Sequence, residues 1–125
     1  MPMNIKVDAL PISVNSLYKK GKYGNTYKTP DADNFRDSMW LAVIAQGREK
    51  IDGFVVIKKA HFYFKDKKKF KSSDVDNLLK HAIDSIVYTG VIKDDRYVKK
   101  ICEVEKFLAD EDHTEICVES SEYTI

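Results

Sequence analysis

Hydrophobic and polar residues alternate along the 125-residue chain with two different periods, which separate strands from helices. In residues 4–10, the apolar Ile5, Val7 and Ala9 alternate with Asn4, Lys6 and Asp8, which predicts a strand that ends at Pro11. Residues 53–64 are rich in β-branched and aromatic residues and predict a long strand. One side of that strand, interrupted by Lys58, carries Phe54, Val56, Ala60, Phe62 and Phe64. Residues 97–107 and 114–118 predict two further strands, with a turn at 110–112.

Two segments have the helical period instead. A helix begins at Thr29-Pro30-Asp31, where Thr29 is the expected N-cap and Pro30 the first helical residue, and ends before Gly47. A second helix begins near Ser73 or Asp74 and precedes Gly90. Its apolar residues follow the i, i+3, i+4, i+7 spacing of an amphipathic helix: Val75, Leu78, Leu79, Ala82, Ile83, Ile86 and Val87. The lysine-rich segment 65–71 between strand and helix is predicted to be a solvated loop.

The element order β-α-β-α-β-β predicts an α/β or α+β fold with two helices packed on a small mixed sheet. The length is that of one domain, covering residues 1–125. No stretch approaches the ~18 apolar residues of a membrane span, and no apolar run follows Met1. We therefore expect a cytoplasmic protein that has no membrane partner. We also expect no organic cofactor.

The net charge of +1 hides a strong asymmetry. Residues 58–71 contain seven lysines and one aspartate, a local charge of +6. Residues 103–122 contain eight acids and one lysine, a local charge of −7. This distribution favours a basic surface that meets a polyanion and an acidic surface that does not.

Acidic residues are concentrated on the second predicted helix and in the loop that follows it. Asp74 and Asp76 are followed by Lys80 and Asp84 at intervals of four residues, and the Asp94-Asp95 pair lies beyond Gly90. Close carboxylates raise one another's pKa unless a cation lies between them, and oxygen ligands suit Mg²⁺ or Mn²⁺. Such a metal would polarise a phosphoryl oxygen and activate a water, while Lys80 would offset negative charge.

A purely structural interpretation explains the same residues. Asp74 would cap the helix, and Asp76, Lys80 and Asp84 would form an exposed ladder of ion pairs. Asp94-Asp95 would be a polar turn, and spacing alone does not decide which of the two points inward. The lysines of 65–71 would simply keep a loop soluble.

Taken together, these residues resemble the RusA family of Holliday junction resolvases, small bacterial and prophage endonucleases. The resemblance extends from about Ile5 to Val118 and rests on three segments. They are Pro11-Ile12-Ser13-Val14-Asn15-Ser16-Leu17-Tyr18, then Asp74-x-Asp76-Asn77-x-x-Lys80-x-x-x-Asp84, and finally Gly90-Val91-Ile92-Lys93-Asp94-Asp95.

The resemblance implies a metal-dependent endodeoxyribonuclease that resolves four-way junctions by paired symmetric cuts, in DNA recombination and repair. Asp74, Asp76 and Asp95 would hold the metal, and Lys80 would be the essential lysine. Asn77 and Asp84 would hold the site together. The family works as a homodimer, which we expect to be intertwined. The contacts that we predict to DNA are Lys67, Lys68, Lys69, Lys71, Lys19, Lys20, Asn15 and Tyr18.

The chain departs from the family pattern in two places. Lysines precede the first aspartate where the family often has arginines, and lysine contacts phosphate as a point charge rather than as a fork. Ile12 replaces the second proline of the first segment. Two alternatives remain: a non-catalytic protein that binds branched DNA, and a metal-dependent nuclease for flaps or single strands.

Overall fold

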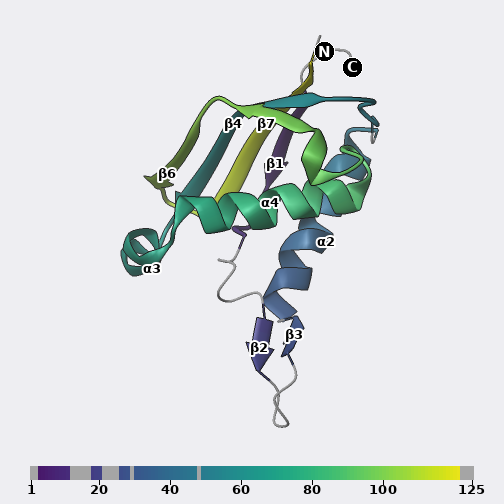
Figure 1. The fold of residues 1–125 in the computed structure, drawn as a ribbon. Coiled ribbons are helices and arrows are strands. Elements are labelled where there is room, and N and C mark those ends of the chain that lie inside the picture. The colour runs from purple at the N-terminus through teal and green to yellow at the C-terminus, as the bar shows by residue number, and fades with distance from the viewer. Residues whose placement is uncertain (1–2, 12–17, 21–25, 29, 48, 122–125) are drawn as a thin grey trace.

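A single mixed sheet, covered on one face by helices, forms the body of the molecule (Figure 1). The computed structural model describes residues 3–11, 18–20, 26–28, 30–47 and 49–121, with the backbone alone at 18–20, 26–28 and 30–33. The strands of the main sheet are β1 (Met3–Val7), β4 (Val55–Phe64), β5 (Val98–Ile101), β6 (Val104–Leu108) and β7 (His113–Ser120). A separate pair, β2 (Tyr18–Lys20) and β3 (Thr26–Lys28), extends away from this body.

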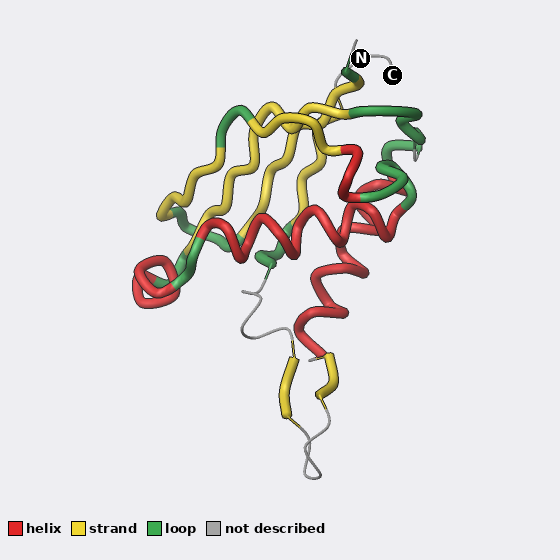
Figure 2. Tube along the Cα trace, viewed as in Figure 1, coloured by secondary structure: helices red, strands yellow, loops and turns green. Residues whose placement is uncertain are grey.

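The strands of the main sheet run in both directions. β7 is antiparallel to both of its neighbours, β1 and β4. β4 is parallel to β5 and β6, which follow one another along its other edge. A parallel connection needs a crossover, and the segment between β4 and β5 supplies it with a helix (Figure 2).

Two long helices and the sheet enclose the core. α2 (Pro30–Ala45) contributes Phe35, Met39 and Val43, and α4 (Val75–Thr89) contributes residues such as Leu78 and Ile86. Both helices pack on the same face of the sheet and against each other. The mixed α+β fold predicted from the sequence is therefore confirmed, with the predicted order of long helices and main strands.

The prediction of which residues share the core side of the long strand was wrong for the first half of the strand. Phe54 and Val56 are only half-buried, and Val55 and Ile57 lie in the core instead. The register against β7 shifts at this point, so Lys58 is the extra residue of a β-bulge. Beyond the bulge, the remaining predicted residues lie in the core as expected. The predicted strand 97–107 is interrupted opposite the bulge, between β5 and β6.

The lysine-rich segment is a helix, so the prediction of a loop was wrong. Among the described residues, α3 (Lys67–Ser72) is a further helix beside the two that the sequence predicted. The Asp66 carboxylate caps its N-terminus by accepting the backbone N–H groups of Lys68 and Lys69. An aspartate at this position is a local signal for the start of a helix, but the lysines around it led to the prediction of a solvated loop.

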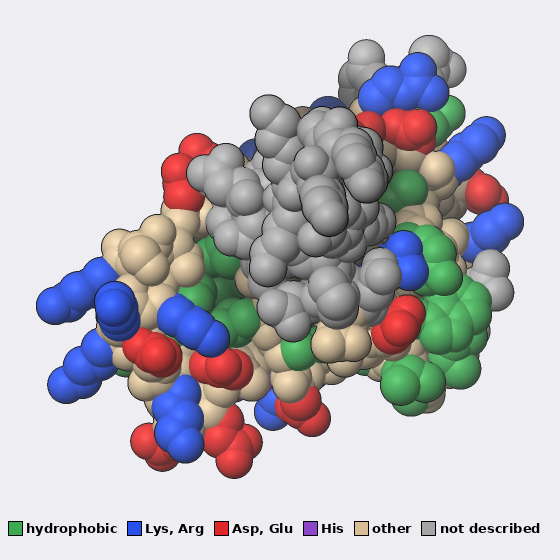
Figure 3. All heavy atoms as spheres, turned by 90° about the horizontal axis from the view of Figure 1, so that it is seen from below, with side chains coloured by type: hydrophobic (Ala, Val, Ile, Leu, Met, Phe, Trp, Pro, Cys, Tyr) green, Lys and Arg blue, Asp and Glu red, His purple; other side chains and the backbone are tan. Residues whose placement is uncertain are grey.

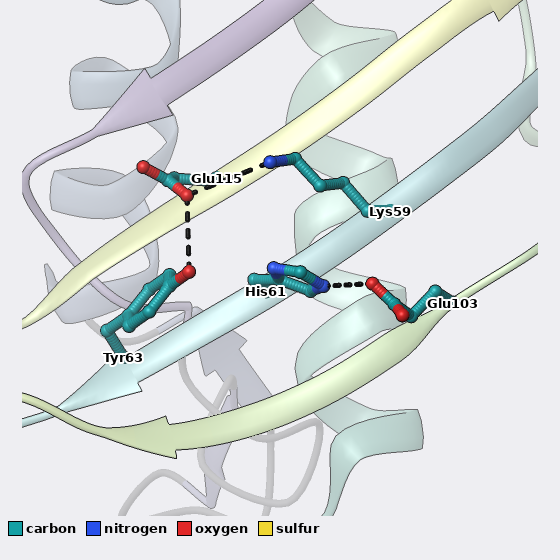
Figure 4. A network of polar contacts seen from close by, with 5 residues as sticks. All are labelled: Lys59, His61, Tyr63, Glu103 and Glu115. Carbon is teal, nitrogen blue, oxygen red and sulfur yellow. Dashed lines mark hydrogen bonds and ion pairs between the residues drawn. The ribbon is translucent and has the colours of Figure 1, made fainter.

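The sheet face opposite the helices carries a polar and aromatic network (Figure 4). Glu115 accepts a hydrogen bond from the Tyr63 hydroxyl at 3.2 Å, and its carboxylate lies 4.0 Å from Lys59 Nζ. Burial, followed by the charge of Glu115, raises the pKa of Tyr63. His61 pairs with Glu103 beside them. Several acids of the C-terminal segment are therefore engaged on the outer face of the sheet.

Within the described residues, no helix is both long and apolar enough to cross a membrane.

Gly90 caps the C-terminus of α4, with φ +86° and a backbone N–H that donates to the Val87 carbonyl. Because side chains disfavour this left-handed conformation, Gly90→Ala should lower the free energy of unfolding by about 1 kcal/mol. Urea denaturation measures the change, with Lys93→Ala at an exposed neighbouring position as the control. Equal stability of the two variants would contradict the role of Gly90 as a helix terminator.

Candidate active site

The N-terminus of α4 places two of the predicted acids. The Asp74 side chain caps the helix, with one carboxylate oxygen accepting the backbone N–H of Asp76 at 2.9 Å. Asp76, Lys80 and Asp84 follow on the exposed side, since the apolar side of α4 is buried in the core. Among the described residues, Lys80 forms no ion pair with either acid. The cap proposed by the structural interpretation is thus present, and the ion-pair ladder is not.

The loop after α4 is held against the body of the fold by apolar residues. Val91 and Ile92 are buried, and the Ile51 N–H donates to the Val91 carbonyl at 2.9 Å. Directly beyond them, the 3₁₀ helix η1 (Asp95–Tyr97) begins. Asp94 caps η1 by accepting from the backbone N–H of Arg96 at 3.0 Å, so its role is local.

A pocket of about 380 Å³ brings the two acidic segments together between α4, η1 and β5. Its polar walls are Asp76, Lys80, Asp84 and Asp95. Its apolar walls are Leu79, Ile83, Val98 and Ile101. Three of the four predicted catalytic residues therefore share one cavity, while Asp74 lies at the adjoining helix terminus. Of the Asp94-Asp95 pair, the second residue lines the pocket.

Electrostatics in the pocket favour a cation. A hydrogen bond with Asp94, then desolvation and the charges of Asp94 and Asp84, raise the pKa of Asp95, and Lys80 only partly opposes this. The pKa of Asp94 is lowered, above all by the backbone N–H of Arg96. The hydrogen bond that the two carboxyl groups share thus moves their pKa values in opposite directions. Negative charge thus accumulates where Asp95 faces α4.

The donor set fits a hard divalent cation. Among the residues that the structure describes, no three His, Cys, Asp or Glu side chains converge to hold a metal. Mg²⁺ often binds through one or two carboxylates while keeping waters and taking substrate phosphates as ligands. Asp76 and Asp95 provide two carboxylates in one pocket, and Lys80 provides a cation for a phosphate beside them.

The basic helix α3 lies next to the N-terminus of α4. Its lysines 67, 68, 69 and 71 are all exposed, and none of α3 is buried. Figure 3 shows basic side chains fanned out at the end of the molecule where α3 lies. A hollow of about 730 Å³ adjoins it, lined by Lys69, Ser72 and Ser73 on one side and by Asn34 and Ser38 of α2 on another.

The predicted N-terminal contacts are only partly described. Tyr18, Lys19 and Lys20 form β2, paired with Thr26–Lys28. Asn15 lies outside the described residues. Pro11, the first residue of the segment 11–18, lines the hollow beside α3.

Comparison with known families identifies the family of this chain. A family model described as Endodeoxyribonuclease RusA matches residues 9–119. The chain belongs to the RusA family. A search of curated proteins found no match. The part matched by the RusA model contains α3, α4 and η1, and hence all the described residues of the candidate site.

Sequence reasoning missed two features of this RusA-family site. The apolar wall formed by Val98 and Ile101 of β5 is one, because it depends on which edge of the sheet faces α4. The other is Lys106, whose ammonium group contacts the end of α3. No sequence signal connects Lys106 with residues more than 30 positions away.

The contribution of Asp74 as a helix cap can be measured through stability, independently of catalysis. Asp74→Asn should change the free energy of unfolding by only a few tenths of a kcal/mol, whereas Asp74→Ala should lower it by about 1 kcal/mol. Asparagine retains the oxygen that accepts the Asp76 N–H, and alanine does not. Chemical denaturation of both variants gives the comparison, and equal losses would show that the cap contributes nothing.

The interaction between Asp94 and Asp95 predicts that replacing one residue changes the pKa of the other. Asp94→Asn should lower the pKa of Asp95, since it removes the carboxylate whose hydrogen bond, and then whose negative charge, favour the protonated form of Asp95. Carboxyl-carbon NMR titration would measure the shift, with Asp110→Asn as a control in the exposed turn before β7. An unchanged or higher pKa of Asp95 would refute the coupling.

Proposed function

We propose that this RusA-family chain is a metal-dependent endonuclease that cuts four-way DNA junctions by paired hydrolysis of phosphodiester bonds. The observation that carries the proposal is the shared pocket of Asp76, Lys80 and Asp95. These residues come from two separate motifs, and the fold brings them to one place beside a basic helix. A purely structural role of the acids on α4 does not explain why residues of both motifs line the same pocket.

Asp76 and Asp95 are the residues that we assign as holders of Mg²⁺ or Mn²⁺. The resemblance implies Asp74 as a third ligand, and we keep this assignment. Its carboxylate caps α4 beside the pocket and does not converge with Asp76 and Asp95 in the described structure, so it would have to turn toward them when the metal binds. When bound, the metal supplies Lewis-acid polarisation of the phosphoryl oxygen and a more acidic water. Asp84 lines the same pocket, and its negative charge and the positive charge of Lys80 act in opposite directions on the pKa of Asp95.

The remaining residues bind and orient the substrate. Lys80 lies one turn beyond Asp76, where its ammonium can stabilise the negative charge that develops on the phosphoryl group. The exposed lysines of α3 bind the phosphate backbone on the approach to the pocket, giving affinity that falls with salt. These contacts position DNA and carry no sequence preference of their own.

We also propose that the active form is a homodimer acting on DNA in the cytoplasm, in recombination and repair. A four-way junction presents two equivalent strands to be cut, and a protein with two-fold symmetry matches them with two identical sites.

The proposal is tested by nicking assays on a strand-labelled four-way junction. The wild-type chain with Mg²⁺ should cut two opposing strands symmetrically, and EDTA should abolish cutting. Asp76→Asn should reduce cleavage by at least about a hundredfold while junction binding persists. Asp110→Asn removes an acid from a turn elsewhere and should cut at the wild-type rate.

Flap, single-stranded and linear duplex substrates complete the experiment. Faster cutting of flaps or single strands than of the junction would show that the preferred substrate is not the four-way junction. Junction binding without cutting under every metal condition would make the chain a binding protein, with the acids of α4 as surface residues.

A further inference from the structure

The short helix α3 is attached to the rest of the fold at several points, although none of its residues is buried. Asp66 caps its first turn. Just before it, the backbone N–H of Lys65 donates to the Asp112 carboxylate at 2.8 Å. Phe70 packs edge-on against Phe64 of β4 with ring centroids 6.0 Å apart. A six-residue helix would be unstable alone, so these attachments decide whether α3 forms.

The attachment at the C-terminal end is made by Lys106 of β6. Its ammonium donates to the carbonyl oxygen of Phe70 and to that of Ser73, the latter at 2.7 Å. The same group lies 4.9 Å from the centre of the Phe70 ring. A cation there meets carbonyls that have no partners within the helix and the negative end of the helix dipole.

The position of Ser73 gives this contact its importance. Ser73 is the residue between α3 and the Asp74 cap of α4. Lys106 therefore fixes the connection between the basic helix and the helix that carries the acids. It is also the one lysine among the eight acids of residues 103–122.

We propose that Lys106 is a positioning residue for DNA binding, which holds α3 folded and oriented so that its lysines reach the phosphate backbone beside the pocket. This proposal rests on the function proposed above. Without Lys106, residues 67–72 would lose a charged attachment and their lysines would have to be ordered on binding, which weakens affinity. Lys106 itself is half-buried and bonded to two carbonyls, so its contribution passes through α3.

A double-mutant cycle tests this role through junction affinity measured in EDTA, where no cutting occurs. Lys106→Met keeps an unbranched side chain over Phe70 and removes the ammonium. It should raise the Kd by about fivefold in the wild-type background, and by less than about twofold in a chain carrying Lys67→Ala, Lys68→Ala and Lys71→Ala. Lys106→Arg retains donors for the carbonyls and should bind within about twofold of wild type.

Two measurements exclude simpler explanations. Lys58→Met removes the same unit of charge from an ion pair with Glu119 on the sheet, and it should leave the Kd within about twofold. Amide hydrogen exchange without DNA should show faster exchange at residues 70–73 in Lys106→Met, with protection of α4 and β4 retained.

Equal effects of Lys106→Met in both backgrounds would overturn the proposal, as would unchanged exchange at residues 70–73. The failure of the proposed function has a different signature. A wild-type chain that binds the junction in EDTA but never cuts it with Mg²⁺ contradicts the nuclease, while the cycle still reports on Lys106.

Discussion

Burial of the apolar side of α4 is the constraint on which the candidate site depends. Leu78, Ala82 and Ile86 are packed in the core, so the helix cannot rotate without exposing them to water. Its opposite side, with Asp76 and Lys80, is thereby held toward solvent and toward η1. The buried Val91 and Ile92 fix the following loop in the same way, which brings Asp95 to the pocket.

The acids next to the pocket show how capping and chemistry can share residues. Asp74 and Asp94 each cap a helical segment, and each is followed by an acid that lines the pocket within two positions. A cap fixes the backbone of the residues directly after it. The structural interpretation of Asp74 and the catalytic one are therefore compatible, because one carboxylate oxygen is enough for the cap.

Local patterns predicted most of this fold, because the signals involved depend only on residues close in sequence. They are the apolar spacing of α4, the helix start at Pro30 and the helix end before Gly90. The family resemblance predicted that Asp76 and Asp95 belong to one site, and both line the same pocket, whereas the apolar wall from β5 was not predicted. The bulge at Lys58 could not be predicted, since it depends on register against β7. α3 was missed for two reasons: the lysine run indicated a solvated loop despite the cap at Asp66, and the contact with Lys106 of β6 is not visible in the local sequence.

The central claim is that the pocket between α4 and η1 is where a divalent cation binds. Mn²⁺ broadens NMR signals near its binding site, so titration of the wild-type chain without DNA tests this claim directly. The account predicts the strongest broadening at the amides of Asp76, Lys80 and Asp95, with little effect on the outer face of the sheet around Tyr63. Strongest broadening in the acidic turn at residues 110–112 would contradict it.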